Sequence, residues 1–325
     1  MKVLVLGGTL FLGRHLVEAA LARGDEVTVF NRGRTNPDLF PEVERLHGDR
    51  DAGDLGALRG REWDAIVDPS ARVPRWVRDT ARLAADTGAH YTFVSSVSVY
   101  RDLSAPGVRE EAPVHTLEDE TVEEIVDSET YGALKALCER ALEEELPGRG
   151  LAVRAGLIVG PYDNTGRFTY WVHRIARGGD VLAPEPRDQP VQFVHARDLA
   201  DWIFLSAERR LAGVFNATGP DALLTLEELL KACGELAESH VTLRWLDERF
   251  LVEQGVQEWS DLPLWVAPGV KEENAGLMSV DVSRALAEGL RFRPLRTTVH
   301  DTLAAAEPTT DAGLTPEREQ ALLAA

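Results

Sequence analysis

The sequence predicts an α/β protein built on a doubly wound parallel sheet, with a smaller C-terminal α/β lobe. The first observation is a short apolar run over residues 2–6, which suits a buried parallel strand. The second is a helical apolar period from about residue 11 to residue 23. The third is another strand pattern over 25–30, which completes a unit of the size of a strand–helix–strand crossover, about 30 residues.

Composition excludes several classes of protein. The 325 residues include 44% hydrophobic and 27% charged residues, as in soluble globular proteins. The net charge of -19 argues against duplex nucleic acid and anionic membranes as partners, because both need a basic face. Cys138 and Cys233 lie far apart without zinc spacing, so we expect buried, reduced thiols and no metal site. No apolar run approaches the roughly 18 residues of a membrane helix, and the chain starts directly in a strand, which predicts a cytoplasmic protein.

A glycine-rich turn separates the first strand from the first helix. A helix start presents free N–H groups and partial positive charge, and glycine lets the backbone approach a pyrophosphate closely. Gly7 and Gly13 hold the outer positions of a Gly-x-x-Gly-x-x-Gly pattern, in which Leu10 replaces the middle glycine. The alternative is a glycine-rich turn that binds no nucleotide. Its position between strand and helix favours a dinucleotide site.

The end of the second strand bears on which dinucleotide binds. An acidic residue there would accept hydrogen bonds from the adenosine ribose 2′-hydroxyl. The sequence instead has Asn31, followed by Arg32 and Arg34. Two guanidinium groups could bind a 2′-phosphate, so NADP is favoured over NAD, the alternative being solvated loop arginines. A further strand over 43–49 ends in Gly-Asp, where a side chain could meet the adenine. A strand over 63–68 is followed by Pro69, Ser70 and Ala71, at the edge where open α/β sheets place ligands.

A serine-rich strand end at 91–100 precedes a long acidic excursion at 101–130, which we expect to contain at most one short helix. Tyr131 and Lys135 follow at i and i+4, on one face of a helix predicted to run to about residue 146. An ammonium beside a phenol favours the phenolate and makes it an acid/base near neutral pH. The alternative is a tyrosine packed on a lysine stem; the upstream nucleotide unit favours catalysis.

Six motifs together carry a family resemblance: GGTLFLG (7–13), FVSSVSVY (93–100), YGALK (131–135), VGP (159–161), QFVHARD (192–198) and FNATG (215–219). Over roughly residues 1–305 the chain resembles the extended short-chain dehydrogenase/reductase superfamily, of the NAD(P)-dependent epimerase/dehydratase type. The resemblance implies a Rossmann-type core over 1–160, with further segments near 191–218, and mainly a substrate-binding lobe over 161–325. It also implies a homodimer, formed through the helices near 76–87 and 131–146.

The resemblance assigns roles to individual residues. It implies that Tyr131 is the general acid/base, that Lys135 activates it and holds the nicotinamide ribose, and that Ser96 hydrogen-bonds the reacting oxygen. With the strand ends described above, the predicted cofactor-binding residues are Gly7, Thr9, Leu10, Phe11, Leu12, Gly13, Asn31, Arg32, Arg34, Asp49, Arg50, Pro69, Ser70, Ala71, Tyr131 and Lys135. The predicted substrate-binding residues are Ser98, Asn164, Arg167 and Trp171.

The chain departs from the superfamily pattern at several positions. Leu10 places it in a variant-glycine branch that resembles chloroplast stem-loop RNA-binding proteins and many bacterial reductases. Val97 and Ser98 stand where 4,6-dehydratases have an Asp-Glu pair, which argues against dehydration and decarboxylation. Val191 and Leu157 stand where many members have an arginine and an asparagine, which weakens the expectation of a nucleotide-diphosphate sugar.

The second half is expected to contain a strand over 151–158 and a helix over 170–177 whose Arg174 is as readily a solvated residue as a ligand. We also expect a capped helix from Thr225 to about Cys233, a strand over 241–246 and an aromatic helix over 250–265 that covers the cleft. A last helix opens at residue 315, where threonine caps and proline follows. His195 is interpreted as a packing residue.

Together these observations predict an NAD(P)-dependent oxidoreductase or epimerase. It would transfer a hydride at a secondary alcohol or ketone of a sugar or sugar-like substrate; reductase and epimerase are not distinguished. The alternative is a nucleotide-dependent binding or regulatory protein on the same fold, including an RNA binder, which the acidic charge disfavours.

Overall fold

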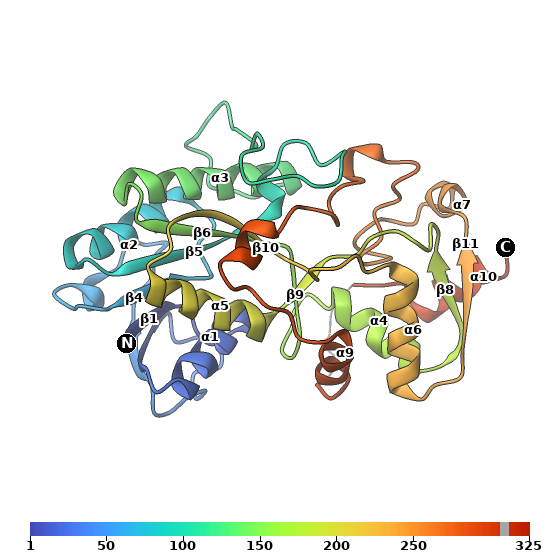
Figure 1. Cartoon of the computed structure of the whole chain (residues 1–325), viewed down its shortest axis with the longest axis horizontal. Helices are drawn as coiled ribbons and strands as arrows, with labels where there is room; N and C mark the ends of the chain where they lie inside the picture. The colour runs from blue at the N-terminus through green and yellow to red at the C-terminus, as the bar shows by residue number, and fades with distance from the viewer. Residues whose placement is uncertain (306–311) are drawn as a thin grey trace.

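A seven-stranded parallel sheet forms one lobe of the computed structural model, which describes residues 1–305 and 312–325 (Figure 1). Its strands are β1 (Lys2–Leu6), β2 (Glu26–Asn31), β3 (Glu44–His47), β4 (Ala65–Asp68), β5 (His90–Ser96), β6 (Gly150–Ala155) and β10 (Gly213–Ala217). Their order is β10-β6-β5-β4-β1-β2-β3, and every pairing is parallel. The predicted α/β class with a Rossmann-like sheet is therefore confirmed.

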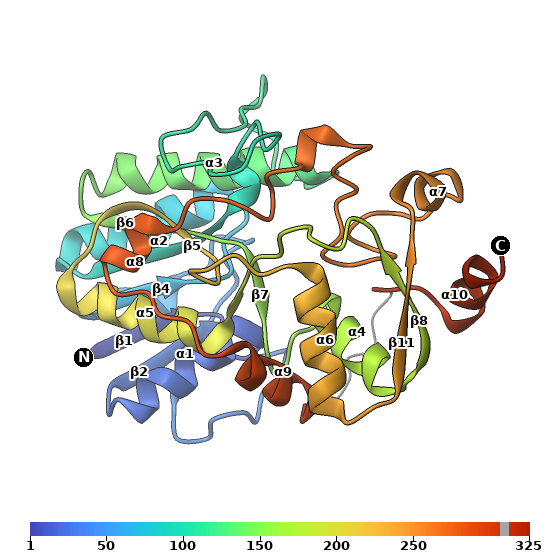
Figure 2. The same ribbon diagram turned by 45° about the vertical axis from the view of Figure 1, so that its right-hand side comes forward.

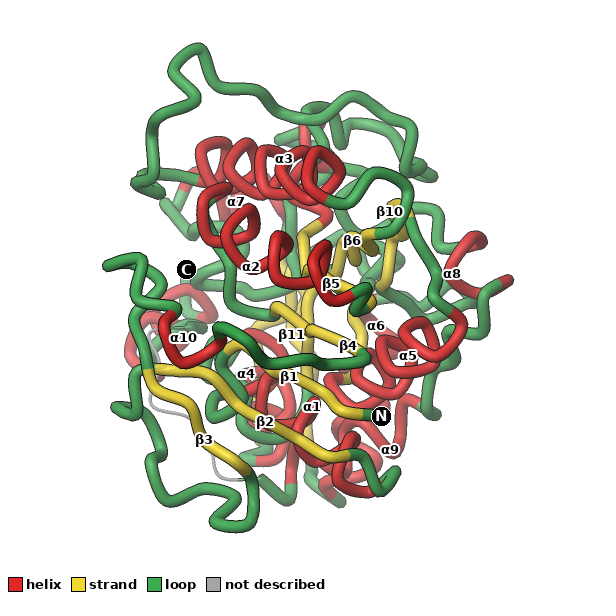
Figure 3. Tube along the Cα trace, turned by 90° about the vertical axis from the view of Figure 1, so that its left-hand side faces the viewer, coloured by secondary structure: helices red, strands yellow, loops and turns green. Residues whose placement is uncertain are grey.

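Helices cover both faces of this sheet. Helices α1 (Phe11–Ala22) and α5 (Ala196–Arg209) pack together on one face, and α2 (Pro74–Thr87) and α3 (Ser128–Glu145) on the other (Figures 1 and 3). Strand β1 shows why its whole sequence is apolar. Val3 and Val5 belong to the core under α1 and α5, whereas Leu4 and Leu6 belong to the core under α2 and α3. Successive side chains of β1 point to opposite faces of the sheet, and on each face they pack against apolar side chains.

Much of the remaining chain forms a second lobe with its own core (Figure 2), whereas the segment that contains Ala285 and Leu290 packs into the core under α1 and α5. Two small parallel sheets lie here, β8 (Gly179–Pro184) with β11 (Val241–Leu246) and β7 (Leu157–Val159) with β9 (Phe193–His195). The other helices are α4 (Arg167–Ala176), α6 (Leu226–Ala237), α7 (Glu248–Glu253), α8 (Ser283–Ala287), α9 (Leu295–Leu303) and α10 (Pro316–Leu323). Short 3₁₀ turns are η1 (Gly56–Leu58), η2 (Val97–Val99) and η3 (Glu272–Asn274).

Several sequence predictions are correct in detail. Thr225 and Glu228 form a complete capping box at the start of α6, and Thr315 caps α10. Both cysteines are buried and free. Within the described residues, no helix is both long enough and apolar enough to cross a membrane.

Other boundaries differ from the predictions. The strand expected over 151–158 is interrupted at Gly156, where a Cβ would overlap the Thr218 side chain, and β7 leaves the large sheet to pair with β9. The aromatic segment 250–265 is not one helix, because α7 ends at Glu253 and turns follow. The described segment 101–127 contains no helix, which is compatible with the expectation of at most one short helix over 101–130. Helix α3 begins three residues before Tyr131, because Asp127 caps it by accepting from the Thr130 N–H.

Candidate active site

One large cleft opens at the carboxyl edge of the seven-stranded sheet, between this sheet and the second lobe. Its volume is about 1170 Å³. Ligands of open α/β sheets bind at this edge. Of the predicted cofactor residues, those that line the cleft are Gly7, Thr9, Leu10, Phe11, Leu12, Gly13, Asn31, Arg32, Arg34, Asp49, Arg50, Pro69, Ser70, Tyr131 and Lys135. Ser96, Ser98 and Arg167 line it as well.

The glycine turn is shaped for close approach. Gly7 and Gly8 have φ values of 119° and 86°, which side-chain-bearing residues rarely adopt. A Cβ on Gly13 would lie 2.8 Å from the Gly8 backbone nitrogen, so Gly13 permits the helix to pack against the turn. Gly8, which the sequence reasoning omitted, lines the cleft and is packed against Val29. Its position next to Gly7 in the sequence could have indicated that Gly8 also lines the cleft.

The first turn of α1 is open to an anion. Leu10 occupies the N-cap, and within the described chain no side chain caps this helix end. Its first turn also holds no acidic residue among those described. The free N–H groups and the positive end of the helix dipole therefore face the cleft without a competing carboxylate. This is the geometry in which helix N-termini bind phosphates.

Two backbone carbonyl groups hold the Lys135 ammonium near the Tyr131 ring. This ammonium is buried and donates hydrogen bonds to the carbonyl oxygens of Ala71 at 2.8 Å and Val94 at 2.9 Å. The Nζ atom lies 5.9 Å from the centroid of the Tyr131 ring. Tyr131 lines the cleft, and its hydroxyl makes no hydrogen bond to another residue that the structure describes. A positioned cation therefore sits beside a phenol that is free to meet a ligand.

The serines at the end of β5 have different roles. The Ser95 hydroxyl donates to Glu139 at 2.5 Å and is thereby tied to α3. The Ser96 hydroxyl instead donates to the Ser98 hydroxyl at 3.0 Å and accepts from the Ser98 N–H at 3.1 Å. Both Ser96 and Ser98 line the cleft, on the same side as Tyr131's helix. Two linked hydroxyl groups are thus presented to a ligand.

The end of the cleft next to the carboxyl end of β2 contains uncompensated positive charge. The Asn31 amide donates to the Gly7 carbonyl and accepts from the Gly33 N–H, both at 2.8 Å, so it fastens the glycine turn. Arg32 and Arg34 are exposed and line the cleft. Neither forms an ion pair with any residue in the described ranges. In a chain of net charge -19, these free guanidinium groups suit an anionic ligand.

Beside them, Arg50 is tied to a carboxylate that sequence reasoning missed. Its two terminal nitrogens donate to the two Asp68 oxygens at 2.9 and 2.6 Å. Burial alone would raise the pKa of the Asp68 carboxyl, but the charge and hydrogen bonds of Arg50, with a hydrogen bond from Tyr91, hold it below its ordinary value. Arg50 is therefore a cleft residue whose charge is already neutralised.

The second lobe contributes the opposite wall. Arg167, the first residue of α4, places its guanidinium carbon 5.4 Å from the centroid of the Trp259 ring. Glu258 and Trp259 also line the cleft. The prediction that segment 250–265 covers the cleft was thus correct in location for these two residues, although not in secondary structure.

Three predicted residues lie elsewhere. Trp171 is fully buried in the core of the second lobe, where its indole N–H donates to the Pro263 carbonyl at 2.5 Å, which corrects its assignment to the substrate. A helical tryptophan on an apolar face is placed by packing, and the sequence does not show which face points to the cleft. Asn164 is exposed and outside the cleft lining. Ala71 is buried and contributes only its carbonyl to Lys135.

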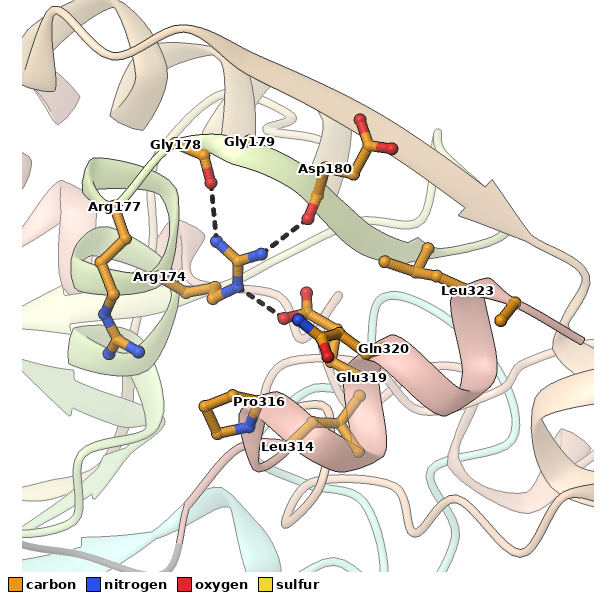
Figure 4. A pocket seen from close by; sticks show the side chains of 11 residues that line it. Arg174, Arg177, Gly178, Gly179, Asp180, Leu314, Pro316, Glu319, Gln320 and Leu323 are labelled. Carbon is orange, nitrogen blue, oxygen red and sulfur yellow. Dashed lines mark hydrogen bonds and ion pairs between the residues drawn. The ribbon is translucent and has the colours of Figure 1, made fainter.

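Arg174 is also outside the cleft. It borders a separate pocket of about 520 Å³ between α4, β8 and α10 (Figure 4). There it pairs with Glu319 at 2.7 Å and donates to the carbonyl oxygens of Gly178 and Asp180. These contacts attach the C-terminal helix α10 to the second lobe. Arg174 is therefore neither solvated nor a ligand in the cleft.

Comparison with known proteins agrees with this geometry. A family model described as "NAD dependent epimerase/dehydratase family" matches residues 3–217. The chain belongs to this family. The matched segment runs from the second residue of β1 to the end of β10, so it includes the large sheet and helix α3 with Tyr131 and Lys135.

The individual proteins that the chain resembles are distant in sequence. The chloroplastic "Chloroplast stem-loop binding protein of 41 kDa b" of Arabidopsis thaliana is 25% identical over 251 residues, which are 72% of this chain and 62% of that protein. The match thus spans less than two thirds of that relative. The UDP-N-acetylglucosamine 4-epimerase of Bacillus cereus has a TM-score of 0.68 at 16% identity, covering 93% of this chain and 98% of its own. Human epimerase family protein SDR39U1, solved with NADPH, has a TM-score of 0.63 at 21% identity, covering 93% and 99%. These two likenesses show the fold alone.

Proposed function

We propose that this family member is an NAD(P)-dependent oxidoreductase or epimerase that acts on a secondary alcohol or ketone of a sugar-like substrate. One observation carries the proposal. The free Tyr131 phenol, the buried Lys135 ammonium and Ser96 line the same cleft as the glycine turn and the open start of α1. This arrangement combines an anion-binding helix end with an acid/base group, as hydride transfer to or from a carbinol requires.

The residues fit a dinucleotide along the whole cleft. The turn at Gly7 and Gly8 and the start of α1 would hold the pyrophosphate. Lys135 would hold the ribose near the nicotinamide. Arg32 and Arg34 would bind a 2′-phosphate, so we propose NADP as the preferred cofactor. When bound, the dinucleotide supplies a hydride donor or acceptor at its nicotinamide ring.

The chain's own groups then handle the proton. In the oxidation direction, the Tyr131 oxygen would accept the proton of the substrate hydroxyl, and the Lys135 cation would stabilise the phenolate before this step. In the reduction direction, the phenol would return the proton to the oxygen of the ketone. The Ser96 hydroxyl would turn its single proton from Ser98 to the same oxygen and donate a hydrogen bond to it. Residues from α4 and the 258–278 segment would hold the rest of the substrate.

The same cleft disfavours elimination chemistry. The 3₁₀ turn η2 carries Val97 and Ser98 directly after Ser96, and Val97 is buried. No carboxyl group is therefore contributed at this position to remove or return a proton at a neighbouring carbon. Reduction and epimerisation both remain compatible with the Ser96, Tyr131 and Lys135 set.

The alternative is a nucleotide-dependent binding protein, and the name of the Arabidopsis relative supports considering RNA. The charge of -19 opposes it, because RNA binding depends on neutralising phosphates with basic side chains. A binding protein also has no evident need of a buried lysine beside a free phenol. Titration with a stem-loop RNA at two salt concentrations separates these functions, since real phosphate contacts weaken steeply with salt.

Calorimetric titration of the purified protein with NADPH and NADH tests the main proposal. We expect saturable binding of both, with NADPH the tighter. Cofactor that stays bound through purification would favour an epimerase, and readily exchanged cofactor a reductase. If neither dinucleotide binds, the enzymatic proposal is wrong. The proposed homodimer, formed through α2 and α3, is tested by light scattering on the same sample.

A further inference from the structure

We call the part of the cleft that is lined by the second lobe its substrate half. A cation, a carboxylate and an indole from distant parts of the chain line this half. Arg167 comes from the start of α4, whereas Glu258 and Trp259 follow α7. Trp259 has a φ of 61°, a left-handed conformation that is costly for a bulky side chain. Such strain persists where surrounding structure holds a residue in place, and here it places the indole against the Arg167 guanidinium.

Arg167 has the properties of an anion receptor. It is half-buried, and it forms no ion pair with any residue of the described chain. Burial lowers the pKa of its guanidinium, while the charges of Asp163 and Tyr131 oppose this effect. A partly desolvated guanidinium without a carboxylate partner gains most from a ligand that supplies one negative group. Arg167 and Tyr131 line the same cleft, so an anionic group bound by Arg167 would share the cleft with the proposed acid/base.

Glu258 has the complementary property. Its side chain is only 12% exposed, and it pairs with the Lys271 ammonium at 3.3 Å. Burial raises the pKa of the carboxyl, which the Lys271 charge partly offsets. A carboxylate in a cleft accepts hydrogen bonds from ligand hydroxyl groups and repels a second ligand anion. The end near Glu258 therefore suits hydroxyl groups.

The substrate half of the cleft contains too little positive charge to bind a diphosphate. Among the described cleft residues beyond residue 94, Arg167 is the only arginine. Val191 and Leu157, which the sequence places where relatives carry polar groups, are buried in the lobe core. Apolar side chains of Val266, Leu277 and Met278 and hydroxyl or amide groups of Thr165, Gln192 and Asn274 complete the wall.

We infer that this half of the cleft binds a polyhydroxy compound with a single anionic group, a carboxylate or a phosphate. The anion would pair with Arg167, hydroxyl groups would donate to Glu258, and the Trp259 indole would cover an apolar face. The inference rests on the proposed function, because it takes Tyr131 as the group at the reacting carbon.

Titration of the NADPH-loaded protein with four probes tests this substrate class. The probes are D-glucuronate, glucose 6-phosphate, neutral D-glucose and UDP-glucose. We expect at least one of the first two to bind about tenfold or more tighter than glucose, the worth of roughly one charge-assisted hydrogen bond. The two anionic probes distinguish a carboxylate from a phosphate preference.

Two variants locate the binding. Arg167→Gln should abolish the preference for anionic over neutral sugar, and Arg167→Lys should restore part of it. Glu258→Gln should weaken both anionic probes by about tenfold, with the affinity for NADPH unchanged. Arg187→Gln is the matched control, because Arg187 stacks on Trp245 with its guanidinium carbon 5.0 Å from the ring centroid and lies outside the cleft lining.

The substrate class is wrong if no anionic sugar binds, if glucose or UDP-glucose binds tightest, or if Arg167→Gln keeps the preference. These outcomes leave the enzymatic proposal intact, provided that NADPH binds. If NADPH does not bind, the enzymatic proposal fails, and the same four titrations on the cofactor-free protein test the Arg167 site separately.

Discussion

Arg50, which lines the cleft, and Asp68 form a bidentate buried ion pair with N–O distances of 2.9 and 2.6 Å. Asp68 also accepts hydrogen bonds from the N–H groups of Ser70 and Ala71, so it shapes the turn after β4. The Ala71 carbonyl in this turn accepts from Lys135. One carboxylate thus connects Arg50 in the cleft with the candidate catalytic lysine.

Asp68→Asn should destabilise the protein markedly. It leaves the Arg50 charge buried without its counter-charge, and breaking a buried pair in this way costs about 3–5 kcal/mol. Urea unfolding measures the loss. The double variant Arg50→Met with Asp68→Leu should lose less, because both charges are gone. Glu44→Gln is the control, since its pair with Arg61 is exposed and is worth about 1 kcal/mol or less. Equal stability of Asp68→Asn and wild type would contradict this account.

Acid should remove the same stabilisation. Because the pKa of Asp68 is lowered in the folded protein from an ordinary value of 3.8, its contribution is fully present above that value. The contribution is lost as the pH falls through the lower folded-state pKa. Unfolding free energy measured between about pH 5 and pH 2 should therefore decline more steeply in wild type than in Asp68→Asn. Parallel declines in the two proteins would show that Asp68 is not responsible.

The fold and much of the cleft could be predicted from the sequence because apolar periodicity and residue spacing determine them. The run over β1 is apolar on both faces because helices cover both, and Tyr131 and Lys135 share a helix face by spacing alone. Asp68 was missed because a single aspartate at a strand end has no pattern, and its partner Arg50 is 18 residues away. Trp171 was misplaced because a helical period identifies an apolar face but not what covers it.

Replacing Arg32 and Arg34 together by glutamine should change the cofactor preference. Each guanidinium is free to bind a 2′-phosphate, and a hydrogen bond to a charged group is worth about 1.5–3 kcal/mol, or roughly tenfold to a hundredfold in affinity. We expect the dissociation constant for NADPH to rise accordingly, with that for NADH nearly unchanged. Arg59→Gln, on the exposed surface, should leave both unchanged. A double variant that still prefers NADPH would place the 2′-phosphate elsewhere.

Gly13→Ala should open the glycine turn. The new Cβ would meet the Gly8 nitrogen at 2.8 Å and its Cα at 3.1 Å, and backbone atoms cannot move aside cheaply. Overpacking of this kind costs about 1–3 kcal/mol, and the shifted turn should weaken NADPH binding as well. Calorimetry and thermal unfolding measure the two effects. Gly56→Ala is the control, because its Cβ would meet nothing closer than Asp54 Oδ1 at 3.6 Å. Unchanged NADPH affinity in Gly13→Ala would separate this turn from the cofactor.

Tyr131→Phe should abolish catalysis while the cleft still binds its cofactor. The ring keeps its place above Lys135, but the group that exchanges a proton with the carbinol oxygen is gone. General acid/base catalysis contributes about 10²–10⁴-fold, so turnover of any ketone found to be reduced should fall by at least that range. NADPH oxidation measures turnover, and calorimetry confirms cofactor binding. Tyr162→Phe is the matched control, because this exposed tyrosine stacks on Arg14 outside the cleft lining. Near-normal turnover in Tyr131→Phe would remove Tyr131 from the mechanism.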